Sequence, residues 1–307
     1  MQKYRLIREG VQAQNVGVVL EEAPTTRDGV LALAHHPHYI EAVSAGSLTA
    51  AAQKEIGFPW STNMVERSRR SVGATIAASR AALATSDQIA VNLAGGTHHA
   101  YADHGGGFCV FNDSAIAARL MQAERRVERV AIVDLDVHQG NGTASILARD
   151  DSIFTLSLHG AANYPFSKEC SDLDVGLPDG TGDDDYLQAL QQALDQMFLR
   201  FAPQLIIYLA GADPHEGDRL GRLKLSLEGL GQRDQMVFSA AGQRAIPLAV
   251  TMAGGYGKNV QDTVSVHLQT IALAARHAHR QVTYLATSGD VSPLNVLPFN
   301  VSPLNFG

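Results

Sequence analysis

The chain has 307 residues, of which 45% are hydrophobic and 18% are charged, as in an ordinary globular protein. Its formal net charge of -7 argues against a surface that coats nucleic acid, and the sequence holds no run rich in lysine and arginine. With only Cys109 and Cys170, no disulfide framework is expected. Any metal ion would therefore be held by histidines and carboxylates.

The start of the chain and its hydropathy indicate where the protein resides. Residues 1–5 lack the apolar core and cleavage site of a signal peptide, and no apolar stretch approaches the length of a membrane span. We expect a cytoplasmic protein with neither nucleic acid nor membrane as a partner. The sequence leaves its oligomeric state open.

Apolar runs typical of buried strands alternate with helical patterns along the chain. The strand-like runs cover residues 88–93, 129–135, 152–158, 205–210 and 247–252. The helical patterns cover residues 63–85, 112–128, 140–149, 183–201, 226–244 and 257–279. Continuous apolar runs are typical of strands covered on both faces. The alternation therefore predicts a single-domain α/β protein with an open, mostly parallel sheet and helices on both faces.

The remaining segments are predicted to be irregular. Residues 160–182 are rich in Gly, Asp, Asn and Pro, which predicts a loop after a strand. No linker divides the chain, so we predict one domain over residues 1–284 and an irregular tail over residues 285–307. Within that tail, the sequence of residues 291–295 recurs at 301–305.

Five polar motifs each follow an apolar strand-like run. They are Gly-Thr-His-His at 96–99, Asp-Leu-Asp-Val-His at 134–138, Ser-Leu-His at 157–159, Gly-Ala-Asp at 211–213 and Gly-Gly-Tyr at 254–256. Because the carboxyl ends of parallel strands share one edge of the sheet, groups far apart in sequence can meet there around one ion. Such a set suits metal-assisted hydrolysis.

The candidate metal ligands are Asp136, His138 and Asp213. Side chains two residues apart in a strand point the same way, so Asp136 and His138 can face one ion, with Asp213 arriving from another motif. Two carboxylates and one imidazole suit zinc and leave a position open for water. The alternative is a solvated strand end, with His138 capping a helix.

The adjacent histidines His98 and His99 follow paired glycines and could act as metal ligands or as acid–base groups. A tandem pair alone is weak evidence. His35, His36 and His38 form a comparable cluster without a strand-end carboxylate nearby, and we assign them to helix packing or the surface.

A tyrosine and a glycine-rich segment complete the candidates. Tyr256 lies between glycines after a strand, where its hydroxyl could donate to a developing oxyanion; the alternative is a turn with an exposed aromatic ring. Residues 105–109, Gly-Gly-Gly-Phe-Cys, lack the spacing of a phosphate-binding loop. A pocket wall built from backbone and Phe108 fits them better.

As an ordered set, these motifs resemble the histone deacetylase family of zinc-dependent acyl-lysine hydrolases. The wording Asp-Val-His-Gln-Gly-Asn-Gly at 136–142 and Gly-Gly-Gly-Phe-Cys at 105–109 looks most like the class IV branch and its bacterial relatives. The resemblance covers about residues 4–279 and implies the arginase/deacetylase fold.

The resemblance also implies roles for individual residues. Zinc, or ferrous iron with its overlapping ligand preferences, would be held by the three candidate ligands. Tyr256 would oppose the metal across the scissile carbonyl. His98 would be oriented by Asp134, and His99 by Asn141. A potassium ion would lie near Asp134, Asp136, His138, Ser157 and Leu158. Gly107, Phe108 and Tyr164 would line the acyl-lysine tunnel, with Leu220 near its floor.

These roles predict a zinc-dependent hydrolase that removes acetyl or longer acyl groups from lysine side chains of proteins or peptides. We favour His99 as the general base, because a neutral Asn141 partner does not raise its pKa. His98, facing a carboxylate, should hold a proton more readily and stabilise the anionic intermediate.

Two departures from the family are visible. Asn141 stands where many class I relatives carry Asp, which agrees with other branches. Relatives usually have a strand and a rim loop before the segment matching residues 1–9. If the chain is complete, the tail after Tyr284 is the only unassigned apolar material that could replace them, and its prolines disfavour this.

Three other functions compete. An amidohydrolase for small acetylated amines, such as acetylpolyamines, would use the same chemistry. A two-manganese ureohydrolase like arginase needs more carboxylates, because residue 141 is Asn and the motif at 211–214 offers only one carboxylate. A metal-dependent binding module would need no acid–base groups. Acyl-chain length stays open, since tunnel depth depends on packing.

Overall fold

A computed structural model describes residues 2–14, 17–85 and 87–287, with side chains described as far as residue 278. Within these residues, six strands form one sheet in the order β1-β6-β5-β2-β3-β4, and every neighbouring pair is parallel. The strands are β1 (Ile89–Asn92), β2 (Val130–Asp134), β3 (Ile153–Gly160), β4 (Leu173–Leu177), β5 (Leu205–Leu209) and β6 (Leu248–Thr251). The predicted parallel α/β architecture is confirmed.

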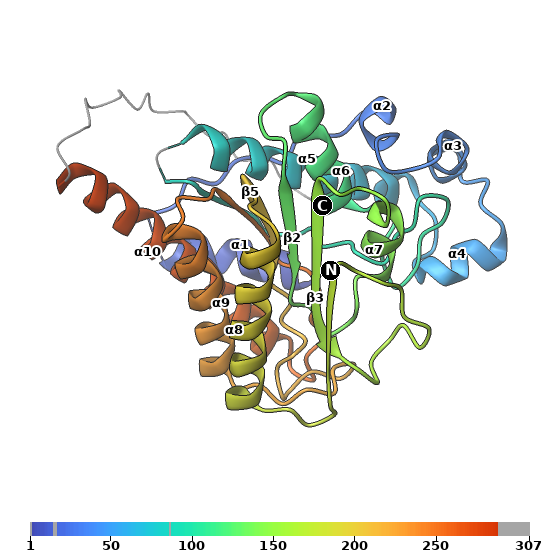
Figure 1. Cartoon of the computed structure of the whole chain (residues 1–307). Coiled ribbons are helices and arrows are strands. Elements are labelled where there is room, and N and C mark those ends of the chain that lie inside the picture. Colours follow the sequence, from blue (N-terminus) through green and yellow to red (C-terminus); the bar gives the residue numbers. More distant parts are fainter. Residues whose placement is uncertain (1, 15–16, 86, 288–307) are drawn as a thin grey trace.

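Helices cover both faces of the sheet (Figure 1). Helices α1 (Gln2–Gln14), α8 (Asp183–Arg200), α9 (Leu227–Gly242) and α10 (Val260–Thr287) pack in one apolar cluster. The other cluster includes side chains of α3 (Pro37–Ala45), α4 (Ala50–Ile56), α5 (Thr62–Ala84) and α6 (Asp113–Ala123). Two short helices, α2 (Asp28–Leu31) and α7 (Asn141–Leu147), complete the order. No described helix has the length and apolar character needed to cross a membrane.

The prediction that residues 160–182 are all loop is wrong, because they contain β4. This strand pairs with β3 from Leu156↔Leu173 to Gly160↔Leu177 and forms one edge of the sheet. Along β4, Asp174 and Gly176 are exposed, whereas Leu173 and Val175 pack against the core. In an edge strand, every second side chain faces solvent and can be polar. The composition of β4 is therefore that of a loop, and the sequence did not predict a strand there.

The helix boundaries differ from the predicted ones in explicable places. α6 ends at Ala123 instead of residue 128, because Arg125 adopts a left-handed backbone with φ 55°. α10 continues through Thr287, so residues 285–287 belong to a helix and not to a tail. The rest of the predicted tail, and its suggested replacement of a strand, lie outside the described residues. The four helices α1 to α4 were not predicted.

Side-chain caps explain where several helices begin. The Ser226 hydroxyl accepts from the Gly229 N–H at 3.0 Å, as its sequence position predicts, and Asn112 accepts from Ala115 in the same way. Residues 183–185 lie in the first turn of α8, where their negative charges favour the helix dipole.

Asp113, at the start of α6, fixes the loop that leads to the adjacent histidines. Its fully buried carboxylate accepts from the backbone N–H groups of Gly96 and Thr97 at 3.0 and 2.7 Å and from the Thr75 hydroxyl at 2.5 Å. Gly95 and Gly96 have φ of 79° and 72°, in the left-handed region that favours glycine. The carboxylate thus holds this left-handed turn in place.

Replacing Asp113 with alanine should lower the free energy of unfolding by about 2–4 kcal/mol, because several buried donors lose their acceptor together. Urea unfolding measures this. Asp184→Ala, at an exposed position in the first turn of α8, is the control and should change stability by less than about 1 kcal/mol, because it loses one favourable interaction with the helix dipole. Equal stability of the two variants would show that the carboxylate does not hold the turn.

His35 has a packing role, as its sequence context suggests. It is 3% exposed; its Nδ1 lies 2.9 Å from the Tyr101 carbonyl and its Nε2 accepts from the Asn112 N–H at 2.8 Å. Burial lowers the pKa of His35 from 6.5 to about 4. Protonation would place a second N–H against the backbone donor of Asn112.

The folded protein should therefore lose stability as the pH falls from about 6.5 to about 4, because the unfolded chain takes up the His35 proton first. The pKa shift of His35 contributes about 3 kcal/mol to the difference in the free energy of unfolding between these two pH values. Urea unfolding at pH 7 and pH 4.5 should show a smaller pH effect in His35→Gln, which cannot titrate. An identical pH effect in that variant would contradict the assignment.

Candidate active site

The candidate side chains converge at the carboxyl edge of the sheet. His98 and His99 follow β1, Asp136 and His138 follow β2, and Asp213 follows β5. These strands lie in the consecutive stretch β1-β6-β5-β2, so the loops that leave them are neighbours. Strand order, and not sequence distance, brings the groups together.

Asp136, His138 and Asp213 form the cluster that the sequence predicts. One ligand atom from each lies within 4.8 Å of the others. The Nδ1 of His138 is 3.0 Å from Asp136 Oδ1 and 3.3 Å from Asp213 Oδ2. Both carboxylates are almost fully buried, at 1% and 0% exposure. The alternative of a solvated strand end is therefore excluded.

Backbone donors hold the two carboxylates while leaving one oxygen free. Asp136 Oδ2 accepts from the Gly254 N–H at 2.8 Å, and Asp213 Oδ1 accepts from the Val137 N–H at 2.9 Å. Asp213 Oδ2 is buried and makes no hydrogen bond. A buried carboxylate oxygen without a hydrogen bond, directed at a second carboxylate and an imidazole, fits a divalent cation.

The charges of the cluster support the same interpretation. Burial acts to lower the pKa of His138, but its contacts with Asp136 and Asp213 raise it to about 10. Burial and the charge of Asp136 raise the pKa of Asp213. Two buried carboxylates thus share a proton on His138, at the position where a cation would satisfy both of them.

The two adjacent histidines have different partners, as predicted. His98 Nδ1 donates to Asp134 Oδ2 at 2.6 Å, and His99 Nδ1 lies 2.6 Å from Asn141 Oδ1. Burial acts against a charged His98, but Asp134 and Asp136 raise its pKa to about 9. Burial, followed by the charges of His98 and His138, lowers the pKa of His99 well below its ordinary value. The surroundings of His98 thus favour its protonated form, whereas those of His99 favour the neutral form that can accept a proton.

Both rings lie beside the metal cluster. His98 Nε2 is 3.8 Å from Asp136 Oδ1, and the His99 ring centroid is 5.8 Å from that of His138. The ring centroids of His98 and His99 are 4.1 Å apart. Two imidazoles with pKa values shifted in opposite directions thus adjoin the same potential ion.

Tyr256 is held at the backbone, beside the pocket wall. Its N–H donates to Asp218 Oδ2 at 2.6 Å, and its ring centroid is 5.5 Å from that of Phe108. Burial and then nearby groups that include Asp213 and Asp136 raise the pKa of Tyr256, so its hydroxyl keeps its proton. That this hydroxyl lies opposite a metal ion, across the substrate carbonyl, stays a prediction.

The predicted wall residues lie around the histidines. A side-chain carbon added to Gly107 would come within 2.5 Å of the His99 ring, so the backbone runs directly against it. Phe108 has a φ of 67° and is 41% exposed, while its N–H donates to the Ile56 carbonyl. Tyr164, 37% exposed, has its ring centroid 4.9 Å from that of His99.

Leu220 does not lie at the buried floor of a tunnel. It is 47% exposed, and its N–H donates to Asp218 Oδ1 at 2.7 Å in the loop that also holds Tyr256. The prediction of a floor position is wrong, because a sequence match places the loop but not the direction of its side chain.

The predicted potassium site stays untested. Asp134 and Ser157 are direct partners across β2 and β3, and Leu158 and Asp136 are buried beside them. The Ser157 hydroxyl lies 3.0 Å from His159 Nδ1.

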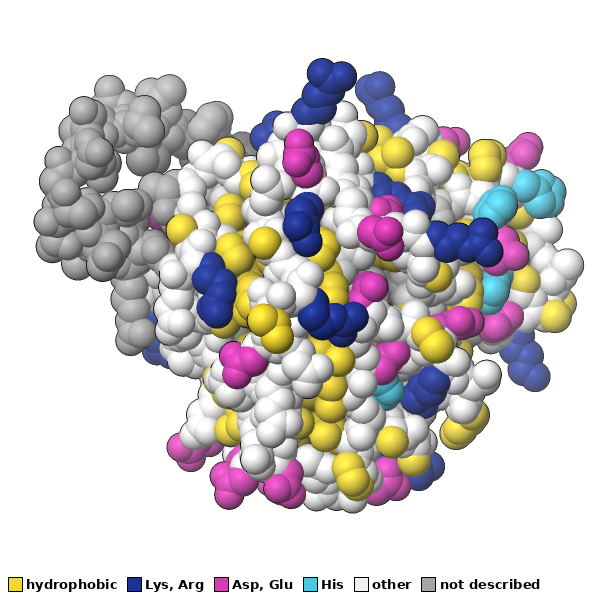
Figure 2. Space-filling view, viewed as in Figure 1, with side chains coloured by type: hydrophobic (Ala, Val, Ile, Leu, Met, Phe, Trp, Pro, Cys, Tyr) yellow, Lys and Arg dark blue, Asp and Glu magenta, His cyan; other side chains and the backbone are white. Residues whose placement is uncertain are grey.

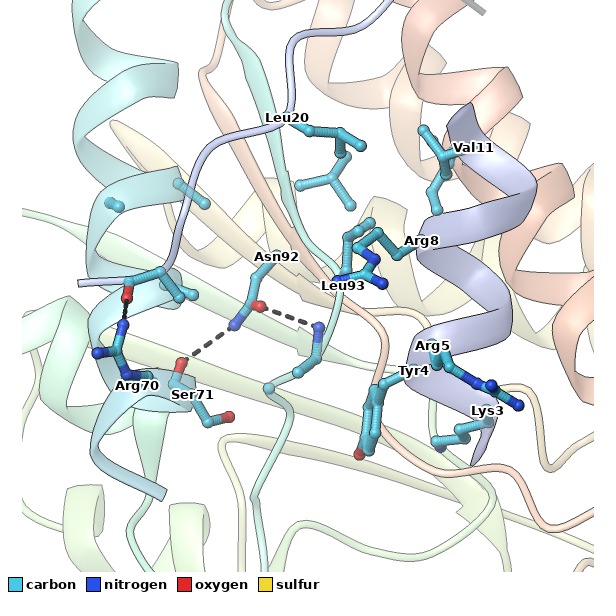
Figure 3. Close-up of a pocket in the computed structure, with 18 of the residues that line it drawn as sticks. Lys3, Tyr4, Arg5, Arg8, Val11, Leu20, Arg70, Ser71, Asn92 and Leu93 are labelled. Atoms are coloured by element: carbon cyan, nitrogen blue, oxygen red, sulfur yellow. Dashed lines mark hydrogen bonds between the residues drawn. The ribbon is translucent and has the colours of Figure 1, made fainter. Parts of the chain in front are cut away.

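A cavity of about 2010 Å³ borders the site on the side of β1. Figure 3 shows Val11 and Tyr4 of α1 facing Leu20 and Leu93 across it. It also reaches Phe108 and Tyr256. Within the described residues β1 pairs only with β6, so the cavity adjoins a free sheet edge.

Several supporting residues have no signal in the sequence. Tyr101 and Glu169 form hydrogen bonds behind Asn141, and Gln139 binds the backbone of Glu169 at 2.7 and 2.9 Å. Arg233, fully buried in α9, donates to the carbonyl of Gly211 at 2.6 Å. A buried arginine that binds a loop carrying a metal candidate could have been found only from the three-dimensional contacts.

Comparisons with known proteins agree with this geometry. The histone deacetylase domain model matches residues 1–271. An uncharacterized protein of Picosynechococcus sp. is 46% identical over 237 residues, covering 77% of this chain and 78% of that protein. A histone deacetylase-like amidohydrolase of Pseudomonas aeruginosa is 34% identical over 252 residues, covering 78% of this chain and 66% of that protein.

Solved structures share the fold. The HDA15 HD domain superposes with a TM-score of 0.75 at 24% identity, over 93% of this chain and 88% of that one. Acetylpolyamine aminohydrolase from Burkholderia pseudomallei superposes with a TM-score of 0.70 at 20% identity, over 89% of each chain. With its family match, its parallel sheet and its convergent site, this chain belongs to the histone deacetylase family.

Proposed function

We propose that the protein is a zinc-dependent hydrolase that removes acetyl or longer acyl groups from lysine side chains of proteins or peptides. The observation that carries this proposal is the buried cluster of Asp136, His138 and Asp213 beside two histidines that have different hydrogen-bond partners and pKa values shifted in opposite directions. A structural ion would not need such acid–base groups. The same observation disfavours a binding module without turnover.

The donor set would hold the metal through one imidazole and two carboxylates, a combination that suits zinc and overlaps the preferences of ferrous iron. When bound, the ion polarises the amide carbonyl and lowers the pKa of water. An arginase-like pair of manganese ions is disfavoured, because residue 141 is Asn and contributes no carboxylate.

The chain's own residues would then move the proton and position the amide. His99, unprotonated at neutral pH, accepts the proton of the attacking water and returns it to the leaving lysine amine. His98, protonated beside Asp134, stabilises the negative charge that develops on the substrate. The Tyr256 hydroxyl donates a hydrogen bond to the same oxyanion.

A small acetylated amine such as an acetylpolyamine is the second candidate substrate. Glu55 is exposed at the end of α4, a side-chain carbon added to Gly106 would lie 3.7 Å from its Cγ, and its charge acts on Tyr164 of the pocket wall. A carboxylate there would attract a cationic amine. A panel of acetyl-lysine peptides, longer acyl-lysine peptides and acetylpolyamines separates the two candidates, and we expect the highest kcat/KM on an acyl-lysine peptide.

Replacing Asp213 with alanine should remove bound zinc, because it deletes the oxygen that has no other partner. Elemental analysis of the purified protein measures the change. The control is Asp184→Ala, which removes an exposed carboxylate from α8 and should retain zinc. Full zinc occupancy in the Asp213 variant would exclude this residue as a ligand.

Tyr256→Phe should lower kcat by about 10²–10³-fold while zinc stays bound, because one hydrogen bond to the oxyanion is lost. Steady-state kinetics and elemental analysis of the same preparation provide the two measurements. Tyr39→Phe is the control, since the Tyr39 hydroxyl donates to the Val110 carbonyl away from the cluster. Unchanged turnover in the Tyr256 variant would refute the oxyanion role.

A further inference from the structure

A chain of hydrogen bonds runs from His99 to a carboxylate outside the predicted site. His99 Nδ1 lies 2.6 Å from Asn141 Oδ1, and Asn141 Nδ2 donates to the Tyr101 hydroxyl at 3.0 Å. The Tyr101 hydroxyl donates to Glu169 Oε1 at 3.1 Å. None of the sequence motifs includes Glu169, which lies in the segment between β3 and β4.

We propose that Glu169 and Tyr101 are positioning residues that set the orientation of the Asn141 amide and thereby the tautomer of His99. The inference rests on the proposed use of His99 as the general base. It concerns which ring nitrogen carries the proton, and that can be measured without substrate.

The direction of each hydrogen bond between His99 and Glu169 follows from the donor and acceptor capacity of the groups. A carboxylate only accepts hydrogen bonds, so the Tyr101 proton is directed to Glu169. The Tyr101 oxygen can then only accept from Asn141, and this turns the amide NH₂ toward Tyr101 and the amide oxygen toward His99. His99 must donate from Nδ1, which leaves the lone pair on Nε2.

The opposite arrangement would be unproductive. If Tyr101 donated to Asn141, the amide NH₂ would face His99 Nδ1, and the ring proton would move to Nε2. The tyrosine oxygen would then face the Glu169 carboxylate with a lone pair, which is repulsive. The negative charge of Glu169 therefore fixes the donor-to-acceptor direction of every hydrogen bond between His99 and Glu169.

The surroundings hold both positioning residues in place. The Tyr101 ring stacks on His104 with centroids 4.4 Å apart and an interplanar angle of 12°. Burial and the charge of Glu169 raise the pKa of Tyr101 to about 12, so the hydroxyl keeps the proton that it donates. The buried Gln139 side chain binds both the N–H and the carbonyl of Glu169.

The test measures the tautomer of His99 directly. In zinc-loaded protein with ¹⁵N-labelled histidine, the His99 ring signals are identified by their absence from His99→Gln. We expect a single Nδ1–H tautomer in the natural protein. In Tyr101→Phe and in Glu169→Ala, the Nε2–H tautomer should appear, and kcat should fall about tenfold with KM unchanged, as loss of one positioning hydrogen bond implies.

Tyr39→Phe is the control, because it also removes one tyrosine hydroxyl bond, here to the buried Val110 carbonyl, and should keep the single tautomer. A single Nδ1–H tautomer in both test variants would overturn the inference, whatever their activity. If the tautomer shifts as expected but the natural protein hydrolyses no acylated amine, the positioning role is supported and the proposed function is refuted. The two failures are thus distinguishable.

Discussion

The site depends on the burial of two carboxylates, Asp136 and Asp213, opposite one imidazole. Burying two like charges side by side is unfavourable unless a positive charge lies between them, and the His138 Nδ1 lies 3.0 Å from Asp136 Oδ1 and 3.3 Å from Asp213 Oδ2. Backbone N–H groups hold the outer oxygens, but they supply only partial positive charge. The groups around these two carboxylates include the buried Arg233, which donates to the carbonyl of Gly211, and the two adjacent histidines.

Most of the architecture could be predicted, because the signals that carry it are local. Fully buried strands such as β2 and β5 are continuous apolar runs, and the helices from α5 onward have clear periodicity or caps. The polar motifs lie where such strands end. Their convergence followed from one topological property, the shared carboxyl edge of a parallel sheet. The ligand trio was therefore predictable by residue, whereas the pairing of His98 with Asp134 and of His99 with Asn141 was implied by the family resemblance.

The remainder depends on contacts that no local pattern encodes. β4 is half exposed, so it has the composition of a loop, and its identity comes only from pairing with β3. Leu220 matched a family position, but its exposure follows from how the Asp218 loop turns. Tyr101 and Glu169 are 68 residues apart in sequence, and Glu169 is linked to Asn141 only through the Tyr101 hydroxyl. Polar residues in loops become informative only when their hydrogen-bond partners are known.

The asparagine at position 141 is coherent with the charges of the whole site. Asp134, Asp136 and Asp213 bring three buried negative charges, which a divalent cation and a protonated His98 together balance. An aspartate at 141 would add a fourth charge and raise the pKa of His99, so that the base would already hold a proton. A neutral amide avoids this, but it can present either its oxygen or its NH₂ group to His99. A carboxylate has two equivalent acceptor oxygens, so it presents an acceptor in either orientation. The neutral partner thus creates the need for a directional neighbour, and Tyr101 with Glu169 supplies one.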